Sequence, residues 1–211
     1  NFFAGVNAGN LTTTGTGSNT GVGAQALLAN TTGYHNSAFG LQALVDNITG
    51  AQNVAIGGYS LQDNTSGTSN VGLGYLSLFF NRTGDKNTVI GAGAGSGASG
   101  NSFSNNTLLG YLSGYSLTTG SNNTLLGFQS GDALTSGSNN ILIGYDIDAP
   151  SATASNQLNI GNLIFSKGID GTGTTLSTGN IGIGTTSPHA KLSVEGSSAL
   201  GNSALAGYFT A

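Results

Sequence analysis

The chain is built on a repeat of 17 residues. An asparagine begins each unit, and Asn1 begins an 18-residue unit of the same kind. A fixed period in this range predicts a solenoid, in which each unit forms one coil that contacts only its neighbours. The later unit starts are Asn19, Asn36, Asn53, Asn70, Asn87, Asn106, Asn123 and Asn140, with two extra residues in the step after Asn87. We therefore predict an all-β parallel β-solenoid (a β-roll or β-helix) of about nine coils over residues 1–158, followed by a short β-rich segment over 159–211.

Three further positions of the unit predict the shape of a coil. Position five is glycine throughout, from Gly5 to Gly144, which predicts a corner with positive φ. Position eight is Ala or Ser from Ala8 to Ser130, small enough to lie inside a narrow coil. We expect position four to form the buried column, because it is apolar in every unit. Its residues are Ala4, Val22, Phe39, Ile56, Leu73, Ile90, Leu109, Leu126 and Ile143.

The asparagine column needs its own explanation, because strands are normally depleted of asparagine. Stacked asparagine side chains can hydrogen-bond to one another along the axis or to the backbone of the turn that holds them. We therefore expect a structural ladder, and an asparagine column that binds a ligand is the alternative.

The turns carry a second regular signal. Four Asn-x-Thr/Ser sequons lie 17 residues apart and begin at Asn30, Asn47, Asn64 and Asn81. Such sequons are possible N-glycosylation sites. The same residues before glycine are also ordinary turn chemistry, which is the interpretation that we favour.

Composition excludes several classes of function. Only 6% of the 211 residues are charged, against about 25% in a typical globular domain. A net charge of −4 gives no electrostatic basis for binding nucleic acid. No apolar stretch approaches the length of a membrane span. The absence of cysteine excludes disulfides and thiolate metal sites and suits an exposed surface protein.

No group of residues predicts catalysis or a cofactor. Residues 95–100 fit the Gly-x-Gly-x-x-Gly pattern, but they lie within a coil and not in a βαβ unit. His35 and His189 lie in turns, and two histidines without cysteine do not make a convincing zinc site. Asp146 and Asp148 could share a calcium ion with Asp170, although a polar turn that ends the array is the simpler interpretation. We expect no enzyme activity, no metal and no cofactor.

The pattern changes after the ninth unit. Pro150 marks a strand end because it cannot donate to a sheet. Residues 159–165 are expected to form one short strand, and residues 191–195 alternate polar and apolar side chains as a half-buried strand does. Residues 197–211 are apolar and repeat-like with nothing of their own to pair with. Two assemblies fit this segment, either three chains wrapped about one axis or subunits joined end to end by addition of this strand.

Two stretches resemble known families. Asn-Val-Ala-Ile-Gly-Gly-Tyr-Ser at 53–60 and Asn-Thr-Val-Ile-Gly-Ala-Gly-Ala-Gly-Ser-Gly-Ala-Ser-Gly at 87–100 resemble the head repeats of trimeric autotransporter adhesins, whose heads are left-handed β-rolls with shorter units. Residues 179–196 resemble the Gly-Asn-x-Gly-Ile-Gly-Thr-Thr-x-Pro-x-x-Lys-Leu-x-Val-x-Gly motif of phage tail-fibre and related bacterial surface proteins. Both resemblances imply an extracellular fibre with no catalytic residues.

The expected function is therefore a structural or adhesive subunit of an extracellular fibre at a cell or virion surface. We expect it to assemble with itself, as a trimer or end to end, and it could contact host or surface glycans. Binding to ice or another crystalline surface is the alternative, supported by the column Thr32, Thr49, Ser66 and Thr83. A polysaccharide-cleaving β-helix would need a carboxylate cluster, and the chain has only eight Asp and Glu in all.

Overall fold

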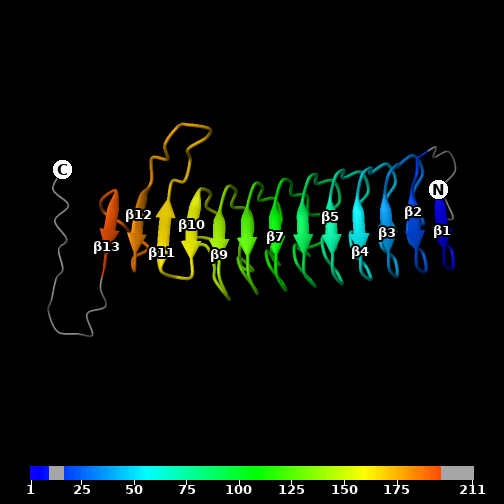
Figure 1. Ribbon diagram of the computed structural model, residues 1–211, viewed down its shortest axis with the longest axis horizontal. Coiled ribbons are helices and arrows are strands. Elements are labelled where there is room, and N and C mark those ends of the chain that lie inside the picture. The colour runs from blue at the N-terminus through cyan, green and yellow to red at the C-terminus, as the bar shows by residue number, and fades with distance from the viewer. Residues whose placement is uncertain (10–16, 196–211) are drawn as a thin grey trace.

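The computed structural model describes residues 1–9 and 17–195 and confirms an all-β parallel solenoid. Within those residues there is no helix, and thirteen strands lie side by side in chain order as one sheet (Figure 1). The strands are β1 (Phe2–Ala4), β2 (Thr20–Val22), β3 (Ser37–Phe39), β4 (Val54–Ile56), β5 (Val71–Leu73), β6 (Thr88–Ile90), β7 (Thr107–Leu109), β8 (Thr124–Leu126), β9 (Ile141–Ile143), β10 (Gln157–Ile160), β11 (Ile164–Lys167), β12 (Asn180–Ile183) and β13 (Leu192–Val194).

The first ten strands are parallel and in register with the sequence repeat, so Thr107 pairs with Thr124 and Leu109 with Leu126. The chain then reverses. The expectation of one strand over residues 159–165 is wrong, because Gly161 and Asn162 adopt left-handed φ angles of 58° and 54°. These two residues turn the chain back, and β11 pairs antiparallel with β10.

Strand β12 is antiparallel to β11, and β13 is parallel to β12. The connection between β11 and β12 projects beyond the row of strands (Figure 1). The expected boundary at residue 158 falls inside β10, which still continues the parallel array. In β13 the expected half-buried alternation is wrong, because Leu192 and Val194 are exposed while Ser193 between them is partly buried. The prediction of an inter-subunit strand over residues 197–211 concerns residues outside the described ones.

The buried column is position three of the unit, and the expectation that it is position four is wrong. Side chains alternate between the two faces of a strand, so a shift of one residue exchanges inside and outside. Leu108 is 0% exposed, whereas its neighbour Leu109 is 41% exposed. Position three also places Ala38, Ala55, Val89, Leu125 and Leu142 in the core, while Phe39, Ile56, Ile90 and Leu126 lie on the outer face.

The core keeps its volume by exchanging large and small residues between positions three and nine. In the second to fifth coils, position nine is a buried leucine (Leu27, Leu44, Leu61, Leu78) and position three is only Gly or Ala. In the first coil and in the sixth to eighth coils, position nine is glycine and position three is a larger residue (Phe3, Val89, Leu108, Leu125). A Cβ atom added to Gly131 would lie 2.9 Å from a methyl carbon of both Leu125 and Leu142. The two arrangements therefore fill the same space, at the density that a protein interior requires.

The glycine corner is confirmed. From Gly5 to Gly144, every position-five glycine has a φ between 131° and 150°. Successive corners approach so closely that a Cβ atom on Gly57 would lie 2.5 Å from the carbonyl oxygen of Gly74. Position eight is also inside the coil as expected, with Ala26, Ala43 and Ser60 fully buried.

Candidate functional site

The asparagine column forms a continuous hydrogen-bonded ladder inside the coils. All eight side chains from Asn19 to Asn140 are buried. From Asn36 onward, the backbone N–H of each asparagine donates to the Oδ1 of the preceding one at 2.8–3.0 Å. The Nδ2 of Asn36 donates to the carbonyl oxygen of Gly50, and that of Asn53 donates to Gly67, both at 2.8 Å.

Gln157 continues the ladder by donating its backbone N–H to the Oδ1 of Asn140. Because the amide oxygen and nitrogen both bond within the protein, the column has no polar group left for a ligand.

The four sequon asparagines form a second buried column. Asn30, Asn47, Asn64 and Asn81 are all 0% exposed. The Nδ2 of Asn47 donates to the Oδ1 of Asn30, and the Nδ2 of Asn64 donates to the Oδ1 of Asn47, both at 2.7 Å. Nδ2 is the atom to which an N-linked glycan is attached, and here it faces the interior. This geometry argues against a glycan on the folded array and matches the turn interpretation of the sequons.

The second column ends where the repeat gains its two extra residues. The Oδ1 of Asn64 is buried without a hydrogen-bond partner. The Oδ1 of Asn81 accepts from the backbone N–H of Phe103 at 3.0 Å. Phe103 is 1% exposed, and the following coils place Leu117 and Leu134 where the earlier coils have the asparagines. Phe103 therefore lies at the boundary between a polar and an apolar half of the interior. In the sequence, the change from Asn to Leu at position twelve of the unit marks this boundary.

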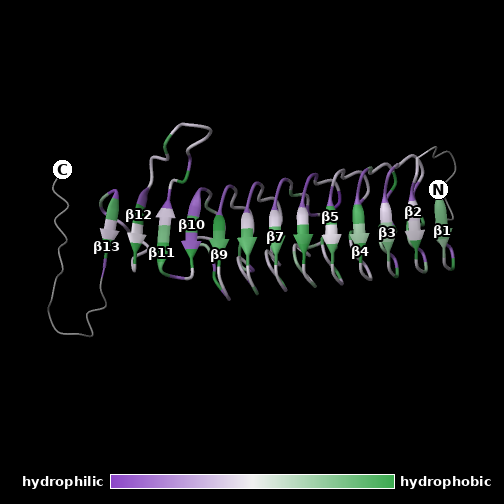
Figure 2. Cartoon of the chain, in the orientation of Figure 1, coloured by the Kyte–Doolittle hydropathy of each residue, from purple (hydrophilic) through white to green (hydrophobic). Residues whose placement is uncertain are grey.

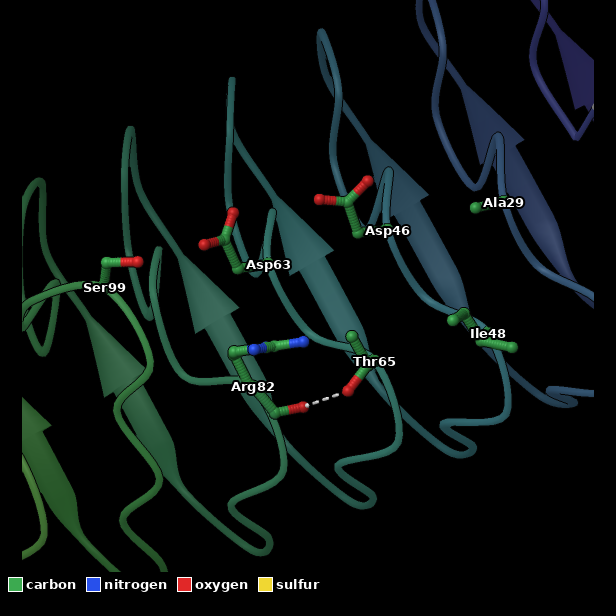
Figure 3. A pocket seen from close by; sticks show the side chains of 7 residues that line it. All are labelled: Ala29, Asp46, Ile48, Asp63, Thr65, Arg82 and Ser99. Atoms are coloured by element: carbon green, nitrogen blue, oxygen red, sulfur yellow. Dashed lines mark hydrogen bonds between the residues drawn. The ribbon is translucent and has the colours of Figure 1, made fainter.

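A shallow groove of about 320 Å³ crosses the turns of the first half (Figure 3). Asp46 and Asp63 lie on adjacent coils, and Figure 3 shows Arg82 and Thr65 beside them. The Thr65 hydroxyl donates to the Arg82 carbonyl oxygen at 3.1 Å. The remaining lining residues are Ala29, Ile48 and Ser99, the last of which comes from the inserted residues. The groove offers acceptors and donors to a polar ligand, and our reading of the sequence missed it.

Asp63 titrates abnormally in this groove. Its pKa is raised, first by burial and second by the nearby Asp46 carboxylate, while Arg82 opposes the shift. An acid with a raised pKa in the folded state lowers stability at neutral pH, and this penalty disappears as the pH falls through that pKa.

We therefore expect Asp63→Asn to raise the melting temperature by a few degrees at pH 7 and to have little effect near pH 3. Thermal melts of both proteins across this pH range measure the effect. Asp46→Asn is the comparison, because it removes the same repulsion. The double variant should gain less than the sum of the two single variants, and an equal gain at both pH values would contradict the assignment.

The other polar candidates are not brought together. Within residues 1–9 and 17–195, no group of three His, Asp or Glu side chains could hold a metal ion. Asp148 accepts the backbone N–H of Ala133, and Asp170 is bonded to Thr178 by backbone and hydroxyl. His35 and His189 are exposed in turns. The same described residues include no helix that is long and apolar enough to cross a bilayer.

The aromatic residues at position six form a stack on the outside. The ring centroids of Tyr111 and Phe128 are 5.4 Å apart, and those of Phe128 and Tyr145 are 5.1 Å apart, with interplanar angles of 17° and 9°. These rings are not part of the buried core, because Tyr111 is 50% and Tyr145 is 75% exposed.

Comparison of the chain with protein-family models, with curated proteins and with solved structures finds no match. The fold defines a β-solenoid repeat protein of about nine turns, and no family is identified. The two sequence resemblances thus agree with the structure at the level of a β-solenoid only.

Proposed function

We propose that the protein is a rigid structural subunit of an extracellular fibre. The observation that carries this proposal is the asparagine ladder, which joins every coil from Asn19 to Gln157 by buried hydrogen bonds along the axis. Each coil also pairs with the next through the parallel sheet. A rod whose neighbouring coils are tied by two sets of axial bonds resists bending and local unfolding, as a fibre shaft must.

The low charge, the absence of cysteine and the fibre-like motifs at 53–60, 87–100 and 179–196 support a place at a cell or virion surface. No enzymatic role is part of this proposal. Its partners are copies of the same chain, and an adhesive role toward surface glycans would use exposed features such as the groove around Asp63.

Electron microscopy of the purified protein tests the proposal. Nine coils at roughly 4.8 Å each predict a straight array on the order of 43 Å long before the C-terminal strands. Limited proteolysis should leave residues 17–160 intact and cut first outside the array. Flexible or globular particles, or rapid cleavage between β2 and β9, would contradict a fibre subunit.

Binding to an ordered solid surface is the second candidate. The expected column Thr32, Thr49, Ser66 and Thr83 lies exposed, but in bends and not on a strand. A better rank exists at position two, where Thr88, Thr107 and Thr124 are paired in register and exposed. It spans three coils only. Measurement of thermal hysteresis separates the candidates, because a fibre subunit should show none and an ice-binding surface should lose it in Thr107→Leu.

A further inference from the structure

We propose that the outer face of β1–β9 packs against the same face of another copy of this chain. The outer face consists of positions two and four of these nine strands. This inference rests on the proposed fibre function and identifies the surface through which subunits associate side by side. Association of whole sheets differs from the end-to-end strand addition expected for residues 197–211.

The outer face is uncharged along its whole length and carries an unbroken apolar column at position four, while position two is Phe, Val or Ile in four strands and Thr or Ser in the other five. None of the nine strands β1–β9 contains a charged residue. Phe39, Ile56, Ile90, Leu109 and Leu126 are each 40–43% exposed although they lie in the middle of a regular sheet. Figure 2 shows hydrophobic strands along the row, β4 and β6 among them. The charged residues Asp46, Asp63 and Arg82 lie on the turns instead. A continuous apolar surface of this extent usually marks an interaction site.

An aromatic column of Tyr111, Phe128 and Tyr145 follows the glycine corner after β7, β8 and β9. A sugar ring would need the open face of an aromatic ring, but Phe128 lies between Tyr111 and Tyr145, and its faces are covered by theirs. What Phe128 offers to the outside is mainly its apolar edge, which suits aliphatic and aromatic side chains. The column therefore favours a protein partner over a saccharide.

The repeat itself indicates that the partner is a second copy. Side chains on the outer face recur once per coil, at roughly 4.8 Å along the axis. A partner that covers the whole face must present side chains at the same spacing. A second copy of this array has the same spacing, because it consists of the same coils. Nine strands of three residues, at roughly 4.8 Å between strands and roughly 3.3 Å per residue, give a face on the order of 43 Å by 10 Å, or about 430 Å² per copy. Two copies would together bury about 860 Å², which is the size of a weak protein interface.

Two charged substitutions test the inference. Leu109→Lys and Thr107→Lys place a cation on the outer face of β7, where it would be buried without a partner between two copies. Ser136→Lys, at an exposed bend on the turn side, is the matched control. Analytical ultracentrifugation of the full chain measures the mass, and circular dichroism checks that each variant is folded.

We expect the wild type and Ser136→Lys to be oligomers, and both outer-face variants to dissociate at least tenfold more readily while retaining the β spectrum. A wild-type monomer at high concentration would overturn the inference, and so would outer-face variants that stay associated. A folded, rod-shaped and protease-resistant monomer would overturn only the interface and leave the structural function standing. A flexible or globular particle would instead refute the proposed function.

Discussion

Leu108→Asp is expected to abolish folding, whereas Leu109→Asp, one residue further along β7, should leave the solenoid folded. Leu108 is 0% exposed and its side chain lies in the continuous core, beside the position that Gly114 keeps open. A carboxylate at this position would be buried without a partner, which costs several kcal/mol beyond the lost apolar burial. The whole stability of a domain is only about 5–15 kcal/mol. Leu109, 41% exposed, can keep an aspartate in water.

Soluble expression and thermal melts of the two variants measure this contrast, with Ile56→Asp as a second outer-face control because Ile56 is 43% exposed. Leu109→Asp and Ile56→Asp should melt within a few degrees of the wild type once the protein is monomeric. Equal loss of folding in all three variants would show that the outer face is as essential to the coil as position three.

The period of the sequence was enough to predict the solenoid, its nine coils and its glycine corner. The choice between positions three and four failed for a physical reason. In the second to fifth coils, position three is Gly or Ala, so position four looked like the only continuous apolar column. The volume that position three leaves empty is filled by Leu27 or Leu44 from position nine, whose left-handed φ of 53–54° no periodicity reveals. Positions three and nine of the unit thus share the core, whereas the apolar pattern of the sequence predicted a single buried column at position four.

The candidate sites depended on details of the turns. The 17-residue spacing places Asp46 and Asp63 on adjacent coils, but whether they share a groove with Arg82 depends on how far each turn extends. The sequons show the same limit. Asn-x-Thr-Gly fits an exposed turn as well as an inward-facing amide, and only the burial of Asn47 and Asn64 distinguishes them.

The asparagine ladder gives the second large effect, in the variant Asn70→Asp. The Nδ2 of Asn70 donates to the carbonyl oxygen of Gly84 at 2.8 Å, and its Oδ1 accepts the backbone N–H and the Nδ2 of Asn87 at 3.0 and 2.9 Å. The carboxylate of an aspartate could still accept from Asn87, but its second oxygen would face the Gly84 carbonyl with no proton between them. Only the neutral carboxylic acid reproduces every bond of the amide, because its O–H can donate to Gly84.

We therefore expect the folded-state pKa of the introduced acid to be raised, by burial and by the Gly84 carbonyl, above its value of about 3.9 in the unfolded chain. A shift of about three units would lower the free energy of unfolding by about 4 kcal/mol at pH 7. Because the raised pKa belongs to the folded state, this loss should diminish as the pH falls through that pKa and vanish near pH 3. Chemical denaturation at pH 7, 5 and 3 measures it, with Asn122→Asp at an exposed turn position as the control. A loss independent of pH would mean that the carboxylate is hydrated inside the coil, and that the ladder is not the closed array of bonds described above.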